Sequence, residues 1–129
     1  MSTDQTAQLD HGDYLSLATL KRSGDYVATP VWFAPRKGSY YIFSAPETGK
    51  IKRLRNFKQC RVAACNATGK LTGEWMDASA RTLERSADKD TALAALREKY
   101  GWKMKITDWL SSLSGKFERR IYIKVDLER

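Results

Sequence analysis

The stretch Tyr40–Lys58, YYIFSAPETGKIKRLRNFK, is the segment around which the rest of the chain is organised. It begins with a short run of aromatic and β-branched residues that is typical of a strand. A turn containing proline and glycine follows. Beyond it, Ile51, Leu54 and Phe57 recur at roughly helical spacing. The pattern predicts a strand, a tight connection and a helix, in that order.

Three cations, Lys50, Lys52 and Arg53, fall near the start of this predicted helix. A helix N-terminus is locally positive, because its first amides are unpaired and its peptide dipoles align, so acidic residues are its usual occupants. Cations are unfavourable there unless an anion lies among them. A phosphate held by helix amides and cationic side chains would satisfy both. The sequence therefore predicts a phosphate-binding site; a solvated charged face is the alternative.

The two best-known nucleotide-binding motifs do not match. A P-loop needs glycine six residues before its lysine and serine or threonine directly after it. Counting from Lys50, those places hold Ser44 and Ile51. No G-x-G-x-x-G follows a predicted strand, so a Rossmann dinucleotide site is not expected either. The predicted phosphate site therefore matches neither the P-loop nor the Rossmann motif.

Length and composition indicate a single folded domain spanning residues 1–129, with a polar segment at 1–12 that we expect to be partly mobile. The formal net charge of +8 predicts an anionic partner, without separating nucleic acid, phosphorylated cofactor and acidic lipid. No apolar run approaches the roughly 20 residues that span a bilayer, and the N-terminus lacks the profile of a signal peptide. We expect a cytoplasmic protein with no membrane partner.

Metal and nucleophilic catalysis find little support in the sequence. Cys60 and Cys65 lie in one predicted strand at an odd separation, which sends them to opposite faces and disfavours a disulfide or a metal clamp. His11 is the only histidine. A zinc site needs several histidine or cysteine ligands, and a Ser-His-Asp or Cys-His catalytic site would have to be built on this one residue. We expect no metal. If the protein is an enzyme, a bound cofactor carries the hard chemistry.

Alternating and helical patterns predict a mainly β (α+β) fold with six strands. The strands are expected at 14–22, 26–34, 40–45, 60–67, 74–83 and 117–128. One helix follows the third strand, and a helical pair over 87–113 precedes the sixth. Its second helix carries an apolar stripe of the kind that packs on a core, formed by Ile106, Trp109, Leu110 and Leu113. This inventory predicts a closed or partly open antiparallel barrel.

The last strand has the clearest alternation. One face should belong to the core and the other to water or an interface. The first face comprises Phe117, Arg119, Ile121, Ile123, Val125 and Leu127, and the second Glu118, Arg120, Tyr122, Lys124, Asp126 and Glu128.

The chain from about Tyr14 to Leu83 resembles the flavin-binding split barrels of the pyridoxamine 5′-phosphate oxidase-like family, most closely the deazaflavin-dependent oxidoreductase branch. The features that carry the resemblance are ATPVWF at 28–33, TGKIKRLR at 48–55 and CRVAAC at 60–65. It implies a homodimer of six-stranded antiparallel split barrels. The ring of FMN or of the 8-hydroxy-5-deazaflavin coenzyme (factor 420) would lie in a cleft between the subunits.

The resemblance also implies which residues bind the cofactor. Backbone groups of Thr29, Val31 and Trp32 would contact the polar edge of the ring. Trp75 would approach the ring or the dimer seam, from the other subunit. The ribityl and phosphate groups would lie near the remaining site residues, which are Ser44, Ala45, Thr48, Lys50, Lys52 and Arg53.

Two departures argue against vitamin oxidation as the activity. Family members that oxidise the vitamin carry arginine where this chain has Gly49, and the ending GKFERRIYIKVDLER lacks their arginine-bearing segment. We therefore expect an oxidoreductase that transfers a hydride or an electron pair to another small-molecule substrate, with no catalytic acid or base identifiable. The alternatives are a non-catalytic flavin carrier or sensor and, less favoured, a nucleic-acid-binding barrel.

Overall fold

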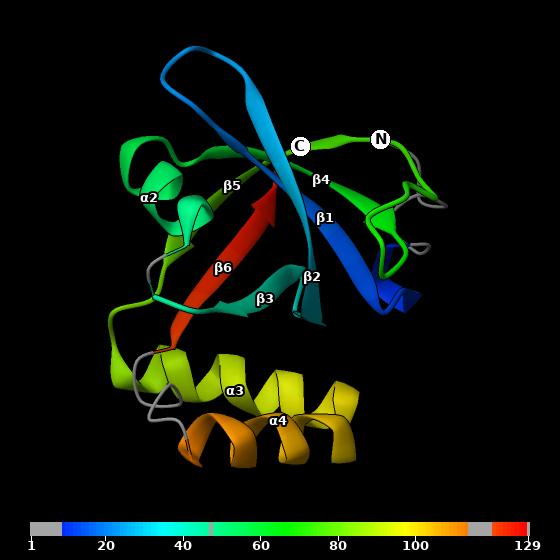
Figure 1. Ribbon diagram of the computed structural model, residues 1–129, viewed down its shortest axis with the longest axis vertical. Coiled ribbons are helices and arrows are strands. Elements are labelled where there is room, and N and C mark those ends of the chain that lie inside the picture. The colour runs from blue at the N-terminus through cyan, green and yellow to red at the C-terminus, as the bar shows by residue number, and fades with distance from the viewer. Residues whose placement is uncertain (1–8, 47, 114–119, 129) are drawn as a thin grey trace.

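The computed structural model describes residues 9–46, 48–113 and 120–128, and shows a closed antiparallel barrel with strand order β1-β2-β3-β6-β5-β4 (Figure 1). The strands are β1 (Tyr14–Leu20), β2 (Tyr26–Arg36), β3 (Ser39–Ser44), β4 (Gln59–Cys65), β5 (Met76–Thr82) and β6 (Ile121–Leu127). The helices are α2 (Gly49–Asn56), α3 (Ser86–Tyr100) and α4 (Trp102–Leu113). The predicted six-stranded fold is confirmed.

The barrel interior is filled by the alternate residues of each strand, as a period of two requires. On β1, Leu15 and Leu17 point inward and are fully buried. On β6 the inward set includes Ile123 and Val125, which confirms the predicted core face for the part of that strand that is described. The predicted start of this strand, at 117, lies outside the described residues.

Helix α2 closes one end of the barrel. Ile51 and Leu54 are buried and belong to the interior cluster, while the charged residues of the helix face outward or toward the strands. Burying these two side chains stabilises the fold by about 3–6 kcal/mol on area grounds. The helix is therefore held by its apolar stripe, and it packs against β1 and β5.

Helix α3 covers the outer face of the barrel beside β2, β3 and β6 (Figure 1). Leu96 is fully buried there, and Trp32, Phe43 and Tyr122 belong to the same cluster. The second face of β6, predicted to meet water or an interface, is thus partly covered by a helix of the same chain. Gly101, with φ +55°, ends α3 at the predicted position.

The segment just before β1 is packed against the barrel. Leu9 is fully buried in the interior cluster, and the Tyr40 hydroxyl donates a hydrogen bond to Asp10. Residues 9–12 therefore differ from the mobile segment expected for 1–12, and the rest of that expectation falls outside the described residues. Cys60 and Cys65 are free and buried on opposite faces of β4, as predicted.

Lys99 lies in an unusual position for a lysine. Its Nζ donates to the Gly12 carbonyl at 2.6 Å and lies 3.4 Å from the ring centroid of Phe33. Burial lowers the pKa of Lys99 from 10.5 to about 8, although Asp13 and Asp10 act in the opposite direction.

This pKa makes stability depend on pH. Between about pH 8 and pH 9 the unfolded chain keeps the Lys99 proton and the folded chain loses it, so the free energy of unfolding should rise with pH. Above pH 9 the raised pKa of Cys60, about 12, acts in the opposite sense. In denaturant titrations across this window, the free energy of unfolding of wild type should rise relative to that of Lys99→Met. If the free energies of unfolding of the two proteins changed with pH in parallel, the lowered pKa of Lys99 would be contradicted.

Helix α4 packs on α3 through a polar contact. Asp108, which is buried, accepts hydrogen bonds from Arg97 at 2.9 Å and from Arg120 at 2.8 Å. Met104 is its fully buried apolar residue. The predicted apolar stripe is wrong as a core face: Ile106, Trp109, Leu110 and Leu113 are all exposed. The pattern predicted the helix correctly but not which side of it is covered.

Candidate functional site

The barrel is split between β2 and β3. Residues 26–32 of β2 pair with β1, but only residues 33–36 pair with β3, and the two strands part at the Phe33–Ile42 pair. On the side away from β1, the edge of β2 from Tyr26 to Trp32 has no strand partner among the described residues. Proline is tolerated at such an edge because it has no N–H to donate, which agrees with Pro30.

The end of β3 and the start of α2 are joined by a side-chain contact. Ser44 ends β3, and its buried hydroxyl is 3.0 Å from that of Thr48, the N-cap residue of α2. The Thr48 side chain makes no capping bond to the helix, and the described first turn contains no acidic residue. The amides of this turn have no intrahelical acceptor, because of their place in the helix. They are available to an anion.

Two cationic groups lie at the start of α2, but only Lys50 belongs to its first turn; Arg53, expected near the start, is in the last turn, and its guanidinium folds back toward Gly49. Burial, and then the charge of Arg53, lower the pKa of Lys50. Among the described residues, neither side chain has a carboxylate within ion-pairing distance. A half-buried pair of like charges is unfavourable by itself, and an anion between them would remove the repulsion. The phosphate site expected at these two residues stays a prediction.

Gly49 keeps the space over the first turn open for Arg53. A Cβ at Gly49 would come within 2.7 Å of the Arg53 guanidinium Nη1. Substitution there would force the guanidinium to move. The glycine that departs from the vitamin oxidases thus has a local role here, which is to let Arg53 fold back over the helix start.

Arg53 links the helix to the open strand. Its Nε donates to the Thr19 hydroxyl at 2.6 Å, and Thr19 on β1 is directly opposite Val27 on β2. Thr29 lies two residues further along β2, on the same face as Val27. The guanidinium is therefore placed beside the face of β2 that carries Thr29.

Thr29 carries a buried polar atom without a partner. Among the described residues its Oγ1 is the buried side-chain oxygen or nitrogen that makes no hydrogen bond. An unsatisfied buried hydroxyl costs about 1–3 kcal/mol, so native structures rarely keep one without a reason. Thr29 lies on the open strand, opposite the buried Leu17 and on the same face as Val31, and a ligand group that reached this hydroxyl would complete the hydrogen bond.

The remaining predicted residues fall into two groups. Val31 is buried in the barrel interior, and Trp32 stacks on Tyr100 with ring centroids 4.6 Å apart, so both side chains pack and only their backbones lie on the open edge. Ala45 and Lys52 are exposed beside the α2 start. Trp75 is 39% exposed and lies just before β5.

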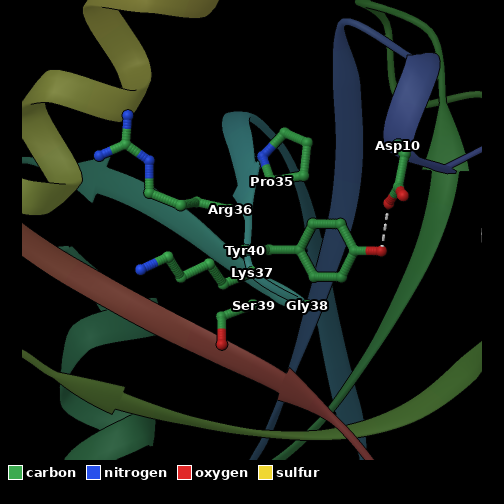
Figure 2. Close-up of a pocket in the computed structure, with 7 residues that line it drawn as sticks. All are labelled: Asp10, Pro35, Arg36, Lys37, Gly38, Ser39 and Tyr40. Carbon is green, nitrogen blue, oxygen red and sulfur yellow. Dashed lines mark hydrogen bonds between the residues drawn. The ribbon is translucent and has the colours of Figure 1, made fainter.

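Concavities are formed at the β2–β3 hairpin and beside α3. One of about 280 Å³ is formed at the β2–β3 hairpin, where Arg36, Lys37 and Tyr40 line it (Figure 2). Arg36 is already paired with Glu98 at 2.8 Å. None of the predicted site residues lines this concavity. The split is an open strand edge of β2 from Tyr26 to Trp32.

Sequence reasoning missed Thr19 and Tyr100. Thr19 holds Arg53 in place. The Tyr100 hydroxyl accepts from the Phe33 amide at 2.9 Å, is 2.7 Å from the Asp13 carbonyl and anchors α3 beneath the open strand. Burial raises the pKa of Tyr100, so the hydroxyl stays protonated. Thr19 could have been noted as an inward polar residue in a strand of leucines; the Tyr100 contacts depend on long-range folding.

Neither a protein-family model nor any curated protein sequence matches the chain. Several solved structures match the chain. An FAD-binding protein of Mesorhizobium loti superposes with TM-score 0.71 at 20% identity, over 100% of this chain and 91% of that one. A Listeria innocua protein provisionally named a pyridoxamine 5′-phosphate oxidase gives 0.64 at 16%, over 96% and 90%. The fold is that of the pyridoxamine 5′-phosphate oxidase-like split barrels.

The same split-barrel fold also holds another kind of ligand. HutZ, a haem storage protein of Vibrio cholerae, superposes with TM-score 0.72 at 16% identity, over 98% of this chain and 89% of that one. Identities this low establish the fold alone. The choice of ligand for this split barrel therefore depends on its own residues.

Proposed function

We propose that this split barrel binds a phosphate-bearing flavin, either FMN or the deazaflavin factor 420, and acts as an oxidoreductase on a small molecule. One observation carries the proposal: Lys50 and the Arg53 guanidinium form a half-buried cationic pair at the start of α2, without a described carboxylate, and Arg53 is bound to β1, the strand that pairs with β2. A cationic pair next to free helix amides suits a phosphate, and an open strand edge suits the hydrogen-bonding edge of a planar ring.

The residues present fit such a cofactor. Lys50, Arg53 and the first amides of α2 would hold the phosphate, and Ser44 and Thr48 would offer hydroxyls to the ribityl chain. Backbone groups of β2 from Thr29 to Trp32 would meet the ring edge, and the unpartnered Thr29 hydroxyl would gain a bond. When bound, the ring supplies hydride or electron-pair transfer. This chain's residues bind and orient it and shield it from water.

A second copy of the chain would complete the site. The edge of β2 from Tyr26 to Trp32 has no strand partner among the described residues, and Trp75 is 39% exposed. If two barrels docked with their splits at the interface, the interface would cover the ring and bring a surface of the partner subunit to it. We therefore include a homodimer in the proposal. Analytical ultracentrifugation of the full chain tests it, and a monomer with the cofactor bound would contradict it.

Haem is less well supported as the ligand. Haem iron needs an axial side chain, most often histidine, cysteine, methionine or tyrosine. His11, the one histidine of the sequence, lies before β1 and is exposed. Cys60 is fully buried in the interior, and its pKa is raised to about 12 by burial, so it is a poor thiolate ligand.

Replacing Thr29 by valine should separate binding from stability. The change keeps the shape of the side chain and removes the unpartnered hydroxyl, so the free energy of unfolding without cofactor should rise by about 1 kcal/mol. Flavin affinity should fall by roughly tenfold for the lost hydrogen bond. Urea titration and flavin fluorescence titration measure the two effects. Lower stability together with unchanged affinity would mean that Thr29 does not face the ligand.

The non-catalytic alternative, a flavin carrier or sensor, shares these binding residues. Single-turnover reduction of the bound cofactor, followed by oxidation with candidate acceptors, separates the two. An enzyme re-oxidises faster with its substrate than with buffer, whereas a carrier shows no such difference. A nucleic-acid-binding barrel would show affinity for oligonucleotides that falls steeply with salt. The concentration of cations at one helix end favours a compact anion instead.

A further inference from the structure

Helix α4 presents an apolar face to solvent. Its members are Trp102, Ile106, Trp109, Leu110 and Leu113, between 49% and 68% exposed. With 3.6 residues per turn, these five fall within an arc about 100° wide. Single exposed apolar residues are common on protein surfaces, but five on one face form a patch that marks an interaction site. We call this set the α4 apolar face.

Two lysines border the α4 apolar face. Lys105 flanks one side of the arc and Lys103 the other, and both are exposed with no carboxylate in ion-pairing distance among the described residues. The one acid of the helix, Asp108, is turned away from the face and held by Arg97 and Arg120. The outward side of α4 therefore carries apolar and positive groups only.

We propose that α4 docks this face on an anionic lipid surface. Helices that lie in a membrane interface combine tryptophan and aliphatic residues on one face with lysines at its edges, whose stems extend along the apolar surface while their ammonium groups reach the headgroups. Twelve residues suffice to lie on a bilayer. No helix in the described part of the chain is long and apolar enough to cross one. The net charge of +8 adds attraction to acidic headgroups.

The charges favour lipid over a second copy as the occupant. A copy of the chain docked on the same face would bring the same two lysines against Lys103 and Lys105, with no acid on the face to neutralise them. An anionic surface neutralises all of them at once. This proposal reverses the expectation of no membrane partner, and it does not depend on the flavin site.

Sedimentation of the full chain with vesicles tests the proposal. We expect binding to phosphatidylcholine vesicles that contain phosphatidylglycerol, weaker binding at high salt, and little binding to phosphatidylcholine alone. The variant Ile106→Glu with Trp109→Glu should bind roughly a hundredfold more weakly. Leu71→Glu, which changes an exposed leucine in the β4–β5 connection, is the matched control and should bind like wild type. Lys103→Glu with Lys105→Glu should lose the dependence on anionic lipid.

Circular dichroism and ultracentrifugation of the same variants complete the test, because all of the substituted side chains are exposed and the fold should persist. Equal vesicle binding by wild type and the Ile106→Glu, Trp109→Glu variant would overturn the proposal. The proposal would also be overturned if wild type did not bind vesicles. A conversion from dimer to monomer in that variant, without vesicle binding by wild type, would assign the α4 apolar face to a second copy.

Discussion

Replacing Lys50 by glutamate should abolish tight binding of FMN and of factor 420 while leaving the barrel folded. Losing a charge-assisted bond to phosphate and placing a carboxylate there costs about 3 kcal/mol, roughly a hundredfold in affinity. The effect on stability has the opposite sign. Glutamate would remove the repulsion between Lys50 and Arg53 and would suit the positive end of α2. The cofactor-free variant should therefore be at least as stable as wild type.

Fluorescence titration gives the affinity and urea denaturation the stability. Lys58→Glu is the matched control, since it reverses one exposed charge just beyond the other end of α2. It should bind flavin about as well as wild type. Unchanged affinity of the Lys50 variant for both cofactors, or an equal loss in the Lys58 control, would remove the α2 N-terminus from the site.

Replacing Asp108 by alanine should be the most destabilising change outside the barrel interior. The carboxylate of Asp108 accepts one bond from Arg97 and one from Arg120, and the Arg120 side chain is only 4% exposed. Without that carboxylate, two guanidinium groups that converge on one point lose the negative charge between them. Breaking a buried ion pair by removing one partner costs about 3–5 kcal/mol. The unfolding transition should also become less cooperative, because α4 would be held less tightly on α3.

Arg97→Ala provides the comparison within the same network. The Arg97 side chain is 49% exposed, and a solvent-screened ion pair contributes about 0–1 kcal/mol. Urea titrations followed by tryptophan fluorescence, which reports on Trp102 and Trp109 of α4, should therefore show a far larger loss for Asp108→Ala. Similar losses for the two variants would mean that burial of the network contributes little.

The strands and α2 were predictable because their patterns are local. Alternation in β1 and β6, the turn residues before α2 and the glycine after α3 each act within a few residues. The place where β2 leaves β3 was not predictable in this way. It depends on how far each strand pairs with another, and Phe33–Ile42 is a contact between strands rather than a motif.

The error on α4 has a different cause. Its pattern predicts an amphipathic helix equally well with either face inward, and the usual assumption is that the apolar face packs on the core. Here Asp108 is on the covered side, which is stable because Arg97 and Arg120 supply the opposite charge. No rule of spacing within the helix reveals those two partners. The exposed tryptophans of this helix would have been a reason to question the assumption.

The central claim is that a phosphate-bearing flavin lies between the start of α2 and the open edge of β2. Amide chemical-shift mapping of the full chain, titrated in turn with FMN and with factor 420, tests it most directly. We predict that at least one of them shifts the amides of Gly49–Ile51 and of Thr29, Val31 and Trp32 more than the amides of other residues. Shifts centred instead on the Arg36–Tyr40 hairpin, or saturable binding of neither cofactor, would contradict it.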